Sequence, residues 1–409
     1  MLHPKTLLTG LSFVFAVFMC AYVANKVFEA AQQKAPIRHI DSRTIYVSGL
    51  CWLTGQSPYN VETFTQMWNQ QMHQQQFQPK ISQGQVVFLY PPSLGIIAIP
   101  LALLSWETAQ AVWDLINVLA LIAMALFSAL LLRKLHLHWG KIGLGIGFSI
   151  WGQMSYILAV IVLGQTALLV TAATLAAFYW AWQRYFWLAA LSIVIASIKP
   201  QISFLPIIYL LIITQSGFFW LISIVLVMGT QLLLLITILD TNPGLAFLRS
   251  LILYQAHSAN TPLLLPGLHS IMAHMGIQPY IMSALPIIGI TLTILLALAY
   301  LKNQPQQSAY QHLLSMTLIL TLCAVVMPIH HYDYTLFFVV MMLIVVVRPL
   351  SAWLALLPGL LLLAQPLFLS GFISDTLKTP VPTLIIASVA ALYLMIVLTR
   401  LVVLQRHVN

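Results

Sequence analysis

The chain has 409 residues, of which 61% are hydrophobic and only 6% are charged, and its formal net charge is +9. Soluble domains carry about 25% charged residues, so this composition excludes a soluble enzyme and predicts an all-α polytopic membrane protein. The positive charge does not indicate nucleic-acid binding, because basic residues in polytopic membrane proteins mainly set their orientation in the membrane.

The first apolar run, Leu7 to Val23, follows Lys5 and has the character of a signal-peptide core. No clean cleavage site follows this run, and its length suffices to cross a hydrocarbon core of about 30 Å. We therefore predict a first transmembrane helix at about 7–28 rather than a cleaved signal.

Residues 30–106 are predicted to form the first extracytoplasmic loop, which is polar and rich in glutamine between Gln66 and Gln85. We expect short juxtamembrane helices in this loop. Pro91-Pro92 opens an apolar segment at 93–104 that is too short to cross the membrane comfortably. This segment is predicted to be a helix that lies at the membrane surface.

A second spanning helix is predicted at 107–132, and it ends at a basic turn, residues 133–141. A second long loop, residues 239–280, is rich in Pro, His and Asn. The whole chain, residues 1–409, is expected to be one domain with about twelve transmembrane helices. The remaining helices are expected near 142–160, 166–182, 185–198, 202–214, 218–238, 281–300, 311–328, 334–347, 351–368 and 382–400.

The charged residues test this count. With twelve helices, basic residues fall in the short turns on one side, whereas all eight acidic residues fall on the other side. The positive-inside rule then places both termini in the cytoplasm. If 93–104 crossed the membrane, the basic turn at 133–141 would face outward. We therefore expect the two long loops, Lys199 and the Pro328–Tyr334 turn on the extracytoplasmic side.

Neither the cysteines nor the adjacent histidines predict a metal site. Cys20, Cys51 and Cys323 include no CxxC pair and form no even set, so we expect neither a disulfide framework nor a zinc site. His330 and His331 are adjacent, and adjacent side chains seldom point at the same ion. The sequence therefore predicts no metal and no other cofactor.

Asp41 lies in the first loop, in the segment Ile40-Asp41-Ser42. A carboxylate here could act as a general base that accepts a proton from an incoming hydroxyl, an effect of about 10²–10⁴ in rate. It could equally cap a helix that begins at this segment. A lone carboxylate is a poor ligand set for a divalent metal.

Lys199-Pro200 interrupts an otherwise apolar hairpin. A lysine at membrane depth costs about 2.5–3.5 kcal/mol, which a phosphate partner would offset; alternatively the ammonium reaches out to the interface along its apolar stem. Tyr90 precedes Pro91-Pro92, and this turn could serve function or only mark the start of a helix. Gly164-Gln165 is a weak signal on its own.

The segment His330-His331-Tyr332-Asp333-Tyr334 follows Pro328. One of its histidines could donate a hydrogen bond to a substrate or to a leaving phosphate. Alternatively the segment is an interfacial turn whose rings lie among lipid headgroups.

Taken in order, these motifs resemble those of glycosyltransferase family 87, a bacterial group also described as domain of unknown function 2029. The matches cover residues 30 to 335, and their order is more specific than any one of them. The last match is the loosest, because the family often has a tryptophan before its histidine. The matching residues are Asp41, Tyr46, Gly49, Gly55, Tyr59, Phe88, Tyr90-Pro91-Pro92, Ala109, Trp113, Gly164-Gln165, Lys199-Pro200 and His331-Tyr332.

The resemblance implies the GT-C fold and an inverting enzyme that takes one sugar from a polyprenyl-phosphate donor. It places the reaction at the outer face of the bacterial cytoplasmic membrane, with a lipid-linked or cell-envelope glycan as acceptor. The family includes mannosyltransferases, which favours a mannose-like hexose. By position, Asp41 would be the catalytic base. Residues available to bind the donor phosphate or substrate are Arg43, Tyr90, Gln165, Lys199, His330, His331 and Tyr332.

Two other classes of protein stay open at this point. A flippase or transporter for lipid-linked sugars predicts an internal repeat and polar residues along a path through the membrane. We find no repeat, and the polar residues gather on one side. An extracytoplasmic glycan polymerase or ligase would work on the same side and is harder to separate by sequence.

Overall fold

The computed structural model describes residues 39–74, 88–236, 261–302, 308–343 and 381–404, together with a few residues before residue 39 and between these ranges. Within this part of the chain the regular secondary structure is helical, without a strand. The elements are α2 (Ile40–Leu53), α3 (Val61–Gln74), η1 (Pro92–Leu94), α4 (Gly95–Ala102), α5 (Trp106–Arg133), α6 (Trp139–Gly152), α7 (Met154–Leu163), α8 (Ala167–Trp182), α9 (Phe186–Ala196), α10 (Pro200–Thr214), α11 (Gly217–Ile236), η3 (Pro262–Leu264), α13 (Leu268–His274), α14 (Pro279–Met282), α15 (Leu285–Lys302), α16 (Ala309–Val326), η5 (His331–Phe337), α17 (Phe338–Met342) and α20 (Val381–Leu404).

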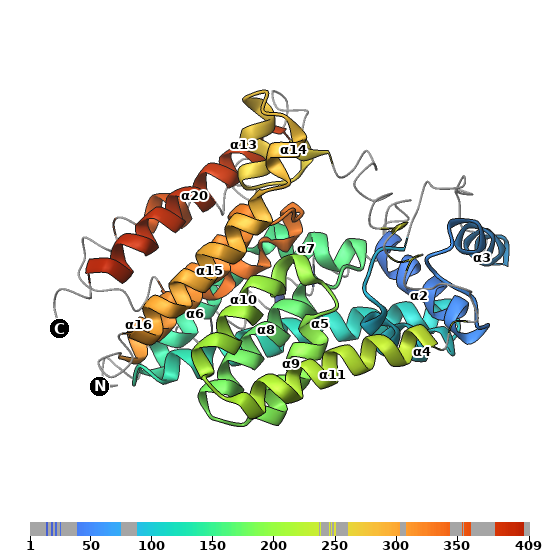
Figure 1. Ribbon diagram of the computed structural model, residues 1–409, viewed down its shortest axis with the longest axis horizontal. Helices are drawn as coiled ribbons and strands as arrows, with labels where there is room; N and C mark the ends of the chain where they lie inside the picture. Colours follow the sequence, from blue (N-terminus) through green and yellow to red (C-terminus); the bar gives the residue numbers. More distant parts are fainter. Residues whose placement is uncertain are drawn as a thin grey trace.

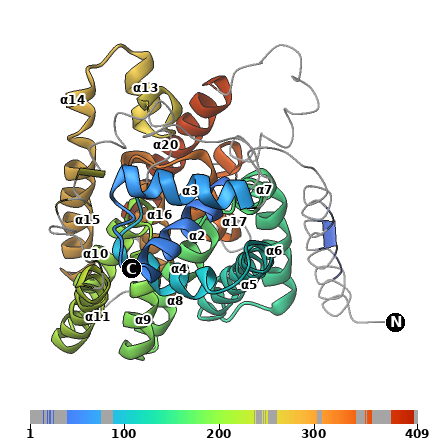
Figure 2. The same cartoon turned by 90° about the vertical axis from the view of Figure 1, so that its right-hand side faces the viewer.

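The helices pack into one bundle, with the segments before α5 gathered at one end of it (Figure 1). α8 contacts α5, α9 and α10, while α10 also contacts α15 and α16, and α16 contacts α20. Figure 2 shows α2 and α3 lying across that end of the bundle. The first long loop thus supplies helices that cover one end of the bundle.

Four described helices, α5, α11, α15 and α16, are long and apolar enough to cross a membrane, and α6 with α7 would make a fifth bent span. In the most apolar 18-residue stretch of each helix, 72% of the stretch is buried in α16 but only 22% in α11. α11 instead exposes large apolar side chains, including Leu221, Met228 and Leu232. Apolar helices that expose such faces are expected to contact lipid, so the chain is an all-α membrane protein. The count of about twelve helices stays a prediction.

The expected span at 142–160 is wrong as a single helix. The chain breaks between α6 and α7 at Gln153, and the two helices are bent by 61°. Gln153 adopts φ −103° and ψ 6°, which interrupts the helix although the apolar pattern continues. The predicted helix at 334–347 is preceded by the 3₁₀ helix η5, at whose start Asp333 accepts the His330 backbone N–H in a capping box.

Several predicted elements fall partly or wholly outside the described residues. They include nearly all of the first helix at 7–28, the glutamine-rich segment beyond Gln74, and most of the second loop before residue 261. Most of the predicted helix at 351–368 also lies outside them. The segment at 93–104, predicted as one helix, is the 3₁₀ helix η1 followed by the short helix α4. Its placement at the membrane surface stays a prediction.

The helices of the first loop are held by contacts between backbone groups and tyrosine hydroxyls. The Tyr46 hydroxyl donates to the Leu104 carbonyl at 2.9 Å, and the Tyr59 hydroxyl donates to the Tyr90 carbonyl at 3.0 Å. α2 lies directly on α4, because Gly49 has no side chain to hold them apart: a Cβ there would lie 2.1 Å from the Ala98 carbonyl oxygen.

Gly49→Ala is therefore expected to destabilise the protein by about 1–3 kcal/mol, since α2 must move away from α4. Thermal unfolding of the purified protein measures this effect. Gly229→Ala on α11 is the matched control, because a Cβ at Gly229 meets nothing within 4 Å and alanine favours a helix over glycine by about 1 kcal/mol. An unfolding temperature of Gly49→Ala equal to that of the wild type would contradict the packing described here.

Candidate active site

The first turn of α2, which carries Asp41, is docked onto the turn between α7 and α8. The His39 backbone N–H donates to the Val162 carbonyl at 2.8 Å. Gly164 adopts φ +72°, and a Cβ there would lie 2.5 Å from the Ser42 hydroxyl oxygen. The Trp113 indole N–H donates to the Gly164 carbonyl at 2.8 Å. Glycine is needed here both for its left-handed backbone and for the close approach of α2.

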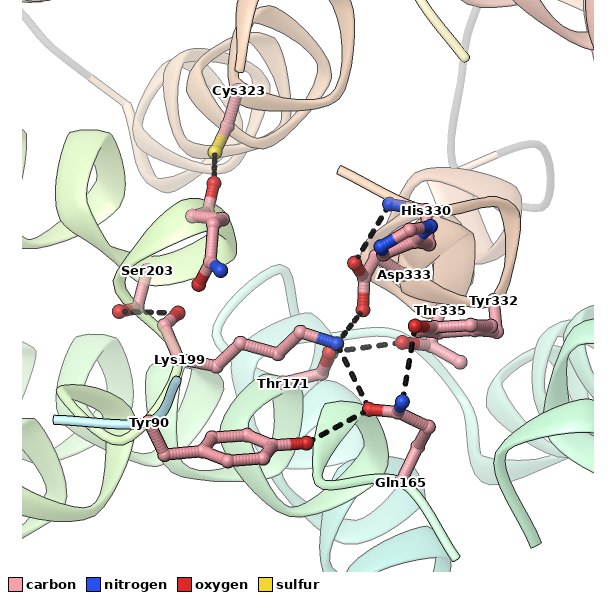
Figure 3. Close-up of polar contacts among 11 residues, drawn as sticks. Tyr90, Gln165, Thr171, Lys199, Ser203, Cys323, His330, Tyr332, Asp333 and Thr335 are labelled. Atoms are coloured by element: carbon pink, nitrogen blue, oxygen red, sulfur yellow. Dashed lines mark hydrogen bonds and ion pairs between the residues drawn. The ribbon is translucent and has the colours of Figure 1, made fainter. Parts of the chain in front are cut away.

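Gln165, the next residue, is the centre of a buried polar cluster (Figure 3). Its Oε1 accepts hydrogen bonds from the Tyr90 hydroxyl and from Lys199 Nζ, both at 3.2 Å. Its Nε2 donates to the Tyr332 hydroxyl at 3.0 Å. One amide thus joins three segments that are far apart in the sequence.

Lys199 forms an ion pair with Asp333, with 2.5 Å between Nζ and Oδ1. Lys199 is 5% exposed and Asp333 is fully buried. The ammonium also lies 4.7 Å from the centre of the Tyr332 ring, while Asp333 Oδ2 accepts the His330 backbone N–H at 3.0 Å. The alternative in which Lys199 extends to the membrane interface is therefore wrong, because its charge is held inside the bundle.

Lys199 precedes Pro200, which occupies the first turn of α10. An ammonium group has three N–H donors. Within the described residues, two of them are used by Asp333 and Gln165. No described residue accepts a hydrogen bond from the third N–H, so that N–H is available to a bound group.

Asp41 faces this cluster. Loss of solvent around its carboxyl raises its pKa to about 6; a hydrogen bond with Gln165 and the charge of Lys199 lower the pKa, whereas Asp333 raises it. The N-cap of α2 is His39, and that helix end has no side-chain cap. The interpretation of Asp41 as the helix cap is therefore wrong, and its carboxyl instead faces Gln165 and Lys199.

Five of the eight predicted site residues meet in this cluster: Asp41, Tyr90, Gln165, Lys199 and Tyr332. The two histidines flank it, since the His330 ring stacks on Tyr332 with 5.2 Å between centroids and the His331 ring meets Tyr332 edge-on. Arg43 lies elsewhere along α2, with its guanidinium 5.8 Å from the centre of the Trp106 ring.

Sequence reasoning missed Asp333. It named the residue only as part of the segment His330–Tyr334, whereas in the structure Asp333 is the counter-ion of Lys199. A signal was present, because a lysine buried in an apolar protein needs a partner of opposite charge. The separation of 134 residues between the two hid this pairing.

The donor set offers little to a metal ion. Both oxygens of the Asp333 carboxylate are committed, one to Lys199 and the other to a backbone N–H. Among the described residues, no three His, Cys, Asp or Glu side chains are grouped as metal ligands. What the site does combine is one carboxyl that can take a proton and one buried cation with an open N–H.

Comparison with protein families agrees with the motifs. A model of glycosyltransferase family 87 matches residues 88–349, which is more than half of the chain and includes Tyr90, Gln165, Lys199 and Asp333. Asp41 lies before the matched range. No curated protein matches the chain significantly. Since the family model matches more than half of the chain, the chain belongs to glycosyltransferase family 87 and is a membrane glycosyltransferase.

Proposed function

We propose that the protein is an inverting glycosyltransferase that moves one sugar, a mannose-like hexose, from a polyprenyl-phosphate donor to a lipid-linked or cell-envelope glycan. The proposal includes the GT-C fold with about twelve transmembrane helices. It places the reaction at the extracytoplasmic face of a bacterial cytoplasmic membrane. The observation that carries it is the position of Asp41, whose pKa is raised to about 6, beside Lys199 and Gln165.

In this mechanism Asp41 accepts the proton of the acceptor hydroxyl, and a lone pair of the acceptor oxygen attacks the anomeric carbon of the donor. The bond between that carbon and the phosphate oxygen breaks, and its electron pair leaves with the polyprenyl phosphate. A single displacement inverts the anomeric centre. The open N–H of Lys199 would stabilise the charge that develops on the leaving phosphate, which is favourable in a buried site.

Gln165 and Tyr90 would position the reacting groups. Gln165 holds Lys199 through its carbonyl oxygen, and the hydrogen bond from Tyr90 fixes the same oxygen. His330, His331 and Tyr332 would line the phosphate side of the site, because both histidine rings pack on Tyr332. Arg43 would act at a greater distance, from its place on Trp106.

A lipid-linked donor fits this chemistry better than a nucleotide sugar. A nucleotide diphosphate is usually held by a metal at paired carboxylates, whereas the Asp333 carboxylate is already ion-paired with Lys199. A monophosphate on a membrane-soluble carrier needs only one or two cations. No part of this scheme requires nucleic acid or a cofactor.

The test is transfer of a radiolabelled sugar from a polyprenyl-phosphate donor by purified protein in lipid, with bacterial membrane lipids as acceptors. We expect a new labelled product, and we expect excess EDTA to have little effect. Asp41→Asn protein is the control for contaminating activity. Strict dependence on a nucleotide sugar or on a divalent metal would contradict this mechanism.

The same assay separates the two other classes. Movement of the lipid-linked sugar across the membrane without a new glycosidic bond would favour a flippase. A ladder of products that differ by many sugar units would favour a polymerase. A single added sugar is the outcome that the proposed function requires.

A further inference from the structure

The charges of the polar cluster nearly cancel before any substrate binds. Lys199 supplies one positive charge, and Asp333 matches it at 2.5 Å. Asp41 adds a negative charge when it is ionised, and it lies close enough for both residues to influence it. The described cluster therefore carries no excess positive charge, although a phosphate has to bind there.

The two histidines do not change this count at pH 8. Loss of solvent around the rings lowers the pKa of both residues, to about 4 for His330. Both are therefore neutral at that pH. Lys199 can still bind one phosphate oxygen through its open N–H, but Asp333 opposes every further negative charge on the ligand.

We propose that Asp333 is a specificity-determining residue that makes the site prefer a singly charged phosphodiester over a doubly charged phosphomonoester. This inference rests on the proposed function, in which the donor is a phosphodiester and the leaving polyprenyl phosphate is a monoester. A phosphomonoester has a second pKa of about 6, so it carries nearly two charges at pH 8. Asp333 thus lowers the affinity for the doubly charged product more than the affinity for the singly charged donor, which favours product release.

The prediction is that charge sets the preference of the site for a phosphodiester over a phosphomonoester. A phosphate bound to Lys199 would share one ammonium with Asp333, and a unit charge at about 6 Å in an effective dielectric of about 20 changes an equilibrium constant roughly 100-fold. Asp333→Asn removes one negative charge with little change of shape, so the preference for the diester is expected to fall about 10- to 100-fold. Lys199→Met removes the positive charge and is expected to raise the preference by a similar factor.

The experiment measures dissociation constants of two probes for the full-length protein in lipid nanodiscs at pH 8. Farnesyl phosphate is the monoester, and its methyl ester is the diester, so the two probes differ mainly by one charge. The quantity of interest is the ratio of the two dissociation constants in each protein. The double variant Lys199→Met/Asp333→Asn has the wild-type net charge and is expected to regain a near wild-type ratio while binding both probes more weakly.

Thr335→Val is the matched control. Thr335 lies in η5 like Asp333, and the substitution removes its buried hydrogen bond with Thr171 of α8 without changing charge. Its ratio should equal that of the wild type. If Asp333→Asn does not fold, the comparison of Lys199→Met with the double variant still tests the charge at position 333. A wild-type protein that binds neither probe, or transfers no sugar, overturns the proposed function. Normal transfer with the same ratio in every variant overturns this inference alone.

Discussion

Replacing Asp41 with asparagine is expected to lower sugar transfer at least about 100-fold, which is the lower end of what a general base contributes. The amide keeps the shape of the side chain and can still bond to Gln165, but it cannot accept the proton of the acceptor. Initial rates with saturating donor would measure the loss. More than about a tenth of the wild-type activity would be hard to reconcile with a base at this position.

The same substitution is expected to stabilise the fold above pH 6. The pKa of Asp41 is raised from 3.8 to about 6 in the folded chain, so the folded state disfavours the ionised carboxylate. The asparagine protein lacks this cost, and its advantage grows as pH rises from about 4 to 6 and then stays constant. The pKa shift corresponds to at most about 3 kcal/mol in the free energy of unfolding. The measured difference should be smaller, because the side chain is only partly buried. Thermal unfolding at pH 4 and pH 8 checks the sign.

The pKa also sets the pH dependence of the wild-type enzyme. A general base works when it is deprotonated, so kcat/KM is expected to fall as pH drops through about 6 and to level off above it. A flat profile between pH 5 and about 8 would indicate that another group takes the proton.

Lys199→Met is expected to have the second large effect, because it weakens donor binding and also leaves Asp333 buried without its cation. Removing one partner of a buried ion pair costs about 3–5 kcal/mol of stability. We expect a lower unfolding temperature and an apparent donor affinity reduced about tenfold or more. Lys302→Met at the exposed end of α15 is the control for loss of a positive charge.

The double variant Lys199→Met/Asp333→Asn separates the two effects. It should regain most of the lost stability, since no charge stays buried alone. Donor binding should not recover, because the ammonium that meets the phosphate is still missing. If Lys199→Met lowers stability but leaves donor affinity unchanged, the lysine has a structural role only.

Local patterns in the sequence predicted single helices well but not their breaks or their distant contacts. The second span was expected at 107–132 and is found at Trp106–Arg133, where Ser105 caps the start of the helix. The bend at Gln153 was missed because apolar residues continue on both sides of it. A continuous apolar pattern predicts a helix, whereas a break in the helix depends on the backbone angles of a single residue.

The site shows the same division. Asp41, Gln165 and Lys199 could be named from motifs, because a polar residue stands out in a chain with 6% charged residues. Their mutual arrangement could not be derived, since it depends on the close approach of Ser42 to Gly164 and on the distant counter-ion Asp333. Such contacts follow from tertiary packing, which could not be derived from a single sequence.

The short helices around Lys199 bear on how a lipid substrate reaches it. At 1.5 Å per residue, the 11 residues of α9 extend only about 16 Å, which is roughly half of a hydrocarbon core of about 30 Å. α8 and α10 are also shorter than such a core, so the bilayer beside this part of the protein is expected to thin. In the proposed mechanism, the phosphate headgroup of the donor would then cross less hydrocarbon to reach Lys199 than in an undisturbed bilayer. We therefore expect the acyl-chain length of the surrounding lipids to affect substrate access.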